Sequence, residues 1–211
     1  MAALDDISSD SDRLRLPAKG MVFREGDPAL RAFSIVEGVV KLSRLLADGK
    51  QQVVGFRFPG DLIGFGTQKT YAFDAELLTP GHFCRVERRK LDQLLRRYPL
   101  MERRLLDLCL QELASTQDHL VTVGRRSAES RVATFLLGLI EVHRRRAMPI
   151  AELAMPMTRS DIGDFLGLTL ETVSRTFAAF KRQGIIAEPG QQKLRVLNSD
   201  DLTRIAEGDE A

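Results

Sequence analysis

The longest stretch of the chain without glycine or proline covers residues 100–123, and it constrains the fold more than any other feature. No helix breaker interrupts its 24 residues, so the stretch predicts one long helix. Uncharged side chains recur within it at alternating spacings of three and four residues, the heptad pattern by which two helices pair. The predicted pairing positions are Leu106, Cys109, Leu113, Thr116, Leu120 and Val123.

A second apolar stripe, formed by Met101, Leu105 and Leu108, lies on a neighbouring face of this helix. A helix with two apolar faces has two surfaces to cover. We expect the N-terminal part of its own chain on one side and a second copy of the chain on the other. Because no pairing position is charged, we expect this homodimer to form without an effector. The alternative is that the whole helix is buried in one core.

Glycine is concentrated ahead of the long helix, where eight of the sixteen glycines fall within residues 20–66. Short runs of β-branched and aromatic residues between these glycines predict antiparallel strands. Asp48 and Gly49 separate two such runs and fit a hairpin turn. This pattern indicates a small barrel or sandwich. The predicted boundaries are a disordered tail at 1–14, the β domain with a short helix at 15–97, the long helix at 98–124 and a C-terminal domain at 125–211.

Composition excludes several classes of protein. The net charge of +2 is nearly neutral, so a nucleic-acid partner has to be argued from a particular segment. No apolar run reaches the roughly 20 residues of a membrane span, and the N-terminus lacks a signal-peptide pattern, so we expect a cytoplasmic protein. The sequence offers no nucleophile–base pair and no glycine-rich phosphate loop, so we do not expect an enzyme.

Residues 157–183 predict two short helices joined by a tight turn. Thr158, with Asp161 three residues later, fits a helix N-cap, and Thr169 fits the cap of the second helix. Gly167, between the two helices, fits a turn that needs a positive φ angle. This arrangement is typical of a helix-turn-helix DNA-binding motif.

The second helix of the motif has an inward face at Val173, Phe177 and Phe180. The opposite side, near the helix N-terminus, enters the major groove in this motif. The candidate base readers there are Glu171, Ser174 and Arg175. Arginine suits guanine, glutamate accepts from cytosine, and serine bonds a base edge. The alternative is an ordinary surface helix with a Glu–Arg ion pair at four-residue spacing.

Further polar side chains around the motif are candidates for phosphate contacts, which position a protein on DNA without reading bases. They are Thr158, Arg159, Thr169, Thr172 and Lys181, with Arg182 as an additional cation. The segment 147–197 is barely basic, with six Lys and Arg against five Asp and Glu. Two short strands around a turn at 188–190 predict a wing, and helices are expected at 128–145 and 201–206.

These parts together resemble the CRP/FNR family of bacterial transcription regulators over nearly the whole chain. The most specific match is residues 168–175, Leu-Thr-Leu-Glu-Thr-Val-Ser-Arg, whose E-x-x-S-R pattern is that of the FNR-type branch. Residues 60–65 carry the resemblance in the β domain. The family implies an α+β fold with an N-terminal β-roll (a cupin-like jelly roll), a long dimerisation helix and a C-terminal winged helix-turn-helix.

The resemblance also implies a function. A homodimer is expected to bind double-stranded DNA at a TTGAT-N4-ATCAA-like palindrome, where Glu171, Ser174 and Arg175 read the bases, and to contact RNA polymerase as an activator. Alternatives are a β-roll gated by an unidentified small molecule, and a winged helix that contacts protein instead of DNA.

The residues that bind cofactors in other branches of the family are missing from this sequence. Phe65 stands where cyclic-nucleotide binders have glutamate, and residues 71–75 contain no arginine to hold the phosphate. Cys84 alone cannot replace the four cysteines of an iron–sulfur cluster, and the three histidines form no haem or metal pattern. We therefore expect no cofactor and no metal. The chain looks most like the FixK-type regulators, which are controlled largely through their own expression, often in micro-oxic metabolism or nitrogen fixation.

Overall fold

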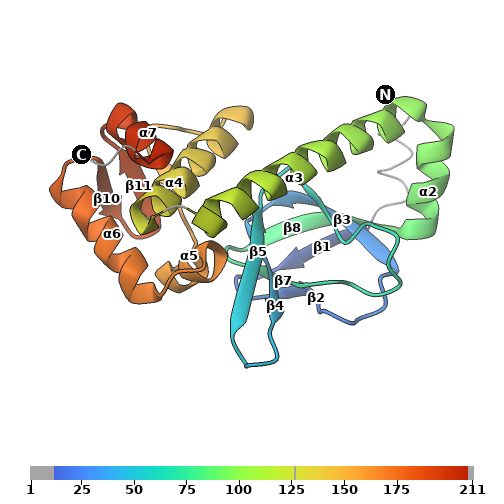
Figure 1. The fold of residues 1–211 in the computed structure, drawn as a ribbon. Helices are drawn as coiled ribbons and strands as arrows, with labels where there is room; N and C mark the ends of the chain where they lie inside the picture. The colour runs from blue at the N-terminus through green and yellow to red at the C-terminus, as the bar shows by residue number, and fades with distance from the viewer. Residues whose placement is uncertain (1–11, 126, 209–211) are drawn as a thin grey trace. The chain divides into compact units, whose positions relative to one another are not determined.

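The computed structural model describes residues 12–125 and 127–208 (Figure 1). The chain forms two compact units, residues 1–114 and 115–211, which we call the roll unit and the winged-helix unit. The long helix α3, Pro99–Arg125, contains the boundary between them. The fold is α+β, as predicted. The division falls within the long helix, whereas the sequence predicted boundaries at its two ends.

The roll unit consists of two four-stranded antiparallel sheets with strand orders β1-β8-β3-β6 and β2-β7-β4-β5. Side chains from both sheets form its core, which includes Phe33, Ile35, Val40, Leu77 and Phe83. The hairpin predicted at Gly49 joins β4 to β5, and Gly49 has a φ of 80°. The strands are β1 Asp12–Leu16, β2 Met21–Phe23, β3 Arg31–Glu37, β4 Val40–Leu45, β5 Gln51–Arg57, β6 Leu62–Ile63, β7 Asp74–Leu77 and β8 Gly81–Glu87.

Strand β1 corrects the predicted disordered tail at 1–14. The strand begins at Asp12 and pairs with β8, with Asp12 opposite Arg85. Arg85 Nη2 lies 3.2 Å from Asp12 Oδ2. Leu14 and Leu16 alternate along β1 and pack against the roll core. This apolar alternation fixes which face of β1 lies on the core. Residues 1–11 of the predicted tail lie outside the described residues.

Two helices follow the strands of the roll unit. Helix α2, Arg88–Arg97, is the short helix predicted for the β domain, and Glu87, with extended backbone angles, is its N-cap. Met101, in the first turns of α3, packs with Leu91 of α2 against Val86. Leu105 and Leu108 of the predicted second stripe are half-buried.

The predicted pairing positions of α3 are largely exposed in the single chain. Leu106, Leu113 and Leu120 retain 57%, 54% and 68% of their accessible surface. Thr116 is also exposed, and Cys109 and Val123 are half-buried. A helix buried in one core would cover its leucines, so the alternative given for this helix is wrong for the single chain. Pairing with a second copy stays a prediction.

The winged-helix unit contains a helix-turn-helix and a small sheet of order β10-β11-β9. The helix predicted at 128–145 is confirmed, whereas β9 was not predicted because its two residues carry no pattern. Helix α7 begins two residues earlier than predicted, since the Asn198 side chain caps it. The elements are α4 Ala128–Arg145, β9 Leu153–Ala154, α5 Arg159–Leu166, α6 Leu170–Arg182, β10 Ile186–Gly190, β11 Lys193–Val196 and α7 Ser199–Glu207.

The turn of the wing lies further along the chain than predicted. Residues 188–190 belong to β10, and Gly190 pairs with Lys193 after a register shift. The chain therefore reverses at Gln191 and Gln192, where Gln192 has a φ of 58°. The register shift accommodates Pro189, which has no backbone N–H for the ladder. The Pro-Gly pair is a bulge in the strand and not the turn itself.

Candidate nucleic-acid interface

The first helix of the motif, α5, is fixed by a complete capping box. Thr158 Oγ1 accepts from the Asp161 backbone N–H at 3.1 Å, and Asp161 Oδ2 accepts from the Thr158 backbone N–H at 2.9 Å. The helix ends at Gly167, whose φ of 65° is the left-handed conformation predicted for the turn. These local interactions set where α5 stops and where α6 can begin.

Gly163 is a requirement of this turn that the sequence pattern did not reveal. A Cβ atom at residue 163 would lie 2.7 Å from the backbone oxygen of Leu168. Such a distance is too short for any side chain. Glycine therefore permits the close approach of α5 to the start of α6. The sequence signal was weak because an isolated glycine in a helical pattern is often tolerated without any close contact.

Helix α6 is oriented by its cap and its apolar face. Thr169 Oγ1 accepts from the Thr172 backbone N–H at 3.2 Å. Val173, Phe177 and Phe180 are at most 1% exposed, as the sequence predicted for the inward face. With this face fixed in the core, the residues on the opposite side of the helix are directed outward.

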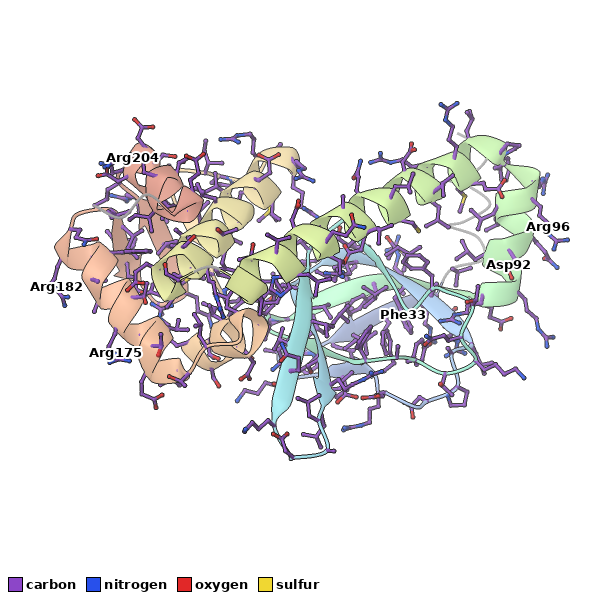
Figure 2. All side chains as sticks on the ribbon, viewed as in Figure 1. Phe33, Asp92, Arg96, Arg175, Arg182 and Arg204 are labelled. Carbon is purple, nitrogen blue, oxygen red and sulfur yellow. The ribbon has the colours of Figure 1, made fainter. Side chains whose placement is uncertain are left out.

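The three predicted base readers lie on that outward side. Glu171 and Arg175 are exposed and Ser174 is half-buried, all within the first two turns of α6. Arg182 is also exposed and follows Arg175 by seven residues, which places both on one stripe of the helix. Figure 2 labels Arg175 and Arg182 along α6. The structure thus presents an acid, a hydroxyl and a guanidinium close together.

The electrostatics of this surface favour the charged form of Glu171 at neutral pH. The pKa of Glu171 is lowered first by its own backbone N–H, then by the Thr169 hydroxyl and by the Arg175 charge. Arg175 Nη2 donates to Thr172 Oγ1 at 3.4 Å. The Arg175 charge acts on Glu171 as well, so the two side chains attract each other. The attraction between Glu171 and Arg175 is compatible with an outward-facing arginine that can still meet DNA.

The predicted phosphate contacts are already engaged within the unit. Thr158 and Thr169 cap helices, and Thr172 accepts from Arg175 and lies 3.1 Å from Thr169, oxygen to oxygen. Arg159 and Lys181 both pair with Glu188 of β10. Composition indicated the near balance of charge in this segment but not the partner of each cation, because strand and helices meet only in the folded unit.

Several polar side chains of the roll unit are bound within that unit. Tyr71 stacks on Phe23 with ring centroids 3.9 Å apart, and its hydroxyl donates to the Arg31 carbonyl at 2.9 Å. Arg88 donates to three backbone oxygens of the loop 64–68, at 2.7 to 3.0 Å. Cys84 is a half-buried residue of β8. Within the described ranges, no three His, Cys, Asp or Glu residues gather as a metal site.

Two family models match the chain. A Crp-like helix-turn-helix domain matches residues 130–205, and a cyclic nucleotide-binding domain matches residues 13–98. The nitrogen fixation regulation protein FixK of Bradyrhizobium diazoefficiens is 39% identical over 177 residues, which cover 83% of this chain and 74% of that protein. The chain belongs to the CRP/FNR family of transcription regulators. It is therefore a DNA-binding regulator, and its relatives are regulators rather than enzymes.

Other members of the CRP/FNR family support this placement. The transcriptional activator protein anr of Pseudomonas aeruginosa is 32% identical and covers 99% of this chain and 85% of its own. The structure of FixK2 from Bradyrhizobium japonicum superposes with a TM-score of 0.85 at 32% identity, covering 95% of this chain and 98% of that one. In the described part of this regulator, no helix has the length and apolar character needed to cross a bilayer.

The cyclic nucleotide-binding match of this CRP/FNR regulator raises the question whether the residues of the roll unit could hold such a nucleotide. A cyclic phosphate needs a cation to balance its charge. Arg88 is bound to backbone oxygens of the loop 64–68, and Arg44 donates to the Ala72 oxygen and pairs with Glu25. Asp74, whose Oδ1 accepts from the Glu25 backbone N–H at 2.8 Å, adds a negative charge beside Glu25. These residues do not fit a cyclic nucleotide.

Proposed function

We propose that this regulator is an activator that binds a TTGAT-N4-ATCAA-like palindrome as a homodimer, with Glu171, Ser174 and Arg175 reading each half-site. The observation that carries the proposal is the outward side of α6, where these three residues lie opposite an apolar face that is almost fully buried. Arginine and glutamate at the N-terminal end of such a helix can reach guanine and cytosine in the major groove.

The exposed leucines of α3 support dimerisation. Leu106, Leu113 and Leu120 recur every seven residues, and each is more than half exposed in the single chain. Pairing α3 with the same helix of a second copy would remove this apolar surface from water. The two recognition helices of such a dimer would then lie about one DNA turn, roughly 34 Å, apart.

Control of this regulator is proposed to require no bound cofactor. Arg88 and Arg44 of the roll unit are already bound within the unit, which supports the amount of protein as the controlled quantity. The bound dimer would contact RNA polymerase in the cytoplasm. The named relatives include nitrogen fixation regulators, which supports target genes of nitrogen fixation or micro-oxic metabolism.

Two measurements test the proposal. In a gel shift at several salt concentrations, the palindrome is expected to bind far more tightly than a duplex with both half-sites scrambled, and equal affinity for the two would refute base reading. Sedimentation of the protein without additives is expected to give a dimer, and a monomer at micromolar concentration would contradict effector-free pairing.

The cyclic nucleotide-binding match supports a second candidate, a regulator gated by another small molecule in the roll unit. A thermal-shift screen with metabolites decides between the two. A metabolite that both stabilises the protein and strengthens operator binding would favour the second candidate.

A further inference from the structure

A single carboxylate of the wing holds cations from both helices of the motif. Glu188 Oε1 pairs with Arg159 Nη2 at the start of α5, and Glu188 Oε2 lies 3.1 Å from Lys181 Nζ near the end of α6. The Arg159 guanidinium also lies over the Phe177 ring, 3.5 Å from the centroid to Cζ. Both oxygens of Glu188 are therefore in contact with positive charge before any DNA arrives.

The charge on Glu188 persists at neutral pH. Partial burial acts to raise the pKa of this carboxyl, but Lys181 and Arg159 outweigh that effect and lower the pKa below its ordinary value. The Glu188 and Arg159 side chains are 25% and 22% exposed, so water screens this cluster less than a fully exposed pair. Together the three side chains carry one net positive charge instead of two.

This geometry affects sequence-independent binding to DNA and sequence-specific binding differently. Binding to DNA of any sequence comes almost entirely from cations that meet phosphates, whereas base contacts add discrimination. A phosphate that approaches Arg159 or Lys181 has to displace Glu188 or meet a cation that is already half neutralised. Arg175 of α6 is less restricted, because it is exposed and its hydrogen bond goes to an uncharged hydroxyl.

We propose that Glu188 restrains the contacts of Arg159 and Lys181 with the DNA backbone, so that binding depends more on the base-reading end of α6. This inference rests on the proposed function, because it assigns a specificity-determining role to a residue beside the same surface. Glu188 acts on DNA through the two cations that it holds.

The test measures the salt dependence of binding to a duplex of random sequence, for the full chain and for Glu188→Gln. Each additional phosphate that the protein neutralises steepens the slope of log affinity against log salt by about 0.9, so release of two cations adds up to about 1.8. Between about 50 and 200 mM salt, the variant should then lose more affinity than the wild type, by a factor of up to roughly twelve. The ratio of operator to random-sequence affinity should fall.

Glu141→Gln is the matched control. Glu141 also holds two cations, Arg144 at 2.8 Å and Arg145 at 2.9 Å, but at the end of α4 rather than beside α5 and α6. Removing its charge changes the net charge by the same amount and should leave the slope unchanged. An equal slope for Glu188→Gln and the wild type overturns the inference, and so does an equal rise in both variants.

Lys181→Gln tests the same idea without breaking the Arg159–Glu188 pair, in case Glu188→Gln lowers the melting temperature. In the wild-type background Lys181→Gln should reduce the slope by well under 0.9, because Lys181 is restrained. A full loss of about 0.9 there contradicts the inference. If the wild type binds no DNA, the proposed function itself fails, whereas unrestrained cations in a protein that binds its palindrome refute only the role of Glu188.

Discussion

The roll unit and the winged-helix unit use arginine in opposite ways. Arg88 of the roll unit donates to three backbone oxygens of the loop 64–68 and lies over the Tyr71 ring. Arg175 of the winged-helix unit makes a 3.4 Å hydrogen bond to one hydroxyl and stays exposed. Arg88 thus completes the fold of its own unit, whereas Arg175 is left accessible to a partner. The same residue type stabilises one unit, and we propose that it reads bases in the other.

The largest expected effect comes from a substitution in the buried core of the roll unit. Phe83 is fully buried, so Phe83→Ala should lower the free energy of unfolding of this unit by about 3–5 kcal/mol. Phe65 is 38% exposed, and Phe65→Ala is the control, expected to cost clearly less than Phe83→Ala. Urea denaturation followed by circular dichroism measures both. Equal losses would mean that the roll unit also uses its surface side chains for stability.

The next effect concerns the presented surface. Arg175→Ala should cost about 1–3 kcal/mol of operator binding and relax the preference at one base pair, with stability unchanged. Arg182→Ala removes the same charge from the same stripe and should weaken all duplexes alike. Fluorescence anisotropy with single-base variants of the palindrome separates the two results. If Arg175→Ala also weakened every duplex equally, Arg175 would be a phosphate contact.

A smaller loss of stability is expected when a helix cap of the winged-helix unit is removed, because this unit depends on local caps. Thr158→Ala removes the hydroxyl that accepts from the Asp161 backbone N–H and should destabilise the unit by about 1 kcal/mol. Thr158→Ser retains the hydroxyl and should recover most of the loss. The readout is the midpoint of urea denaturation, and an alanine variant as stable as the wild type would show that packing alone positions α5.

The smallest effect is a pH dependence in the winged-helix unit. His119 stacks on Phe165 with ring centroids 4.1 Å apart, and burial lowers the pKa of His119, against a weaker opposing effect of a backbone hydrogen bond with Phe165. The folded unit therefore binds this proton less readily than the unfolded chain, whose pKa is about 6.5. Stability is complete above about pH 6.5 and declines as the pH falls toward the folded value.

His119→Phe keeps an aromatic ring against Phe165 and cannot titrate. Its urea midpoint should fall less than that of the wild type between about pH 7.5 and 5.5. A parallel decline in both proteins would assign the pH dependence to other groups.

The sequence predicted the winged-helix motif best where the determining interactions are local. The caps at Thr158 and Thr169 and the turn at Gly167 depend on residues three or four positions apart, and all three are confirmed. The buried face of α6 follows from its helical period in the same way. Such features are readable from a short window of sequence.

Features that depend on distant residues were missed or misplaced. The wing reverses two residues beyond the Pro-Gly pair, because a register shift between strands decides the position of the turn. The partner of Arg159 lies 29 residues away at Glu188, and β1 begins at Asp12 because it pairs with β8. Composition indicated the right charge balance but could not assign these pairs, which form only when separate elements meet.

Gly163 has a consequence for any genetic screen of this regulator. Its missing side chain leaves room for the Leu168 carbonyl, so every replacement strains the junction between α5 and α6. A saturation screen for lost promoter activity would then flag codon 163 beside those for the base readers, although Gly163 is buried. Scoring protein abundance in the same library would separate the two groups, because substitutions at 163 lower the cellular level while recognition variants accumulate normally.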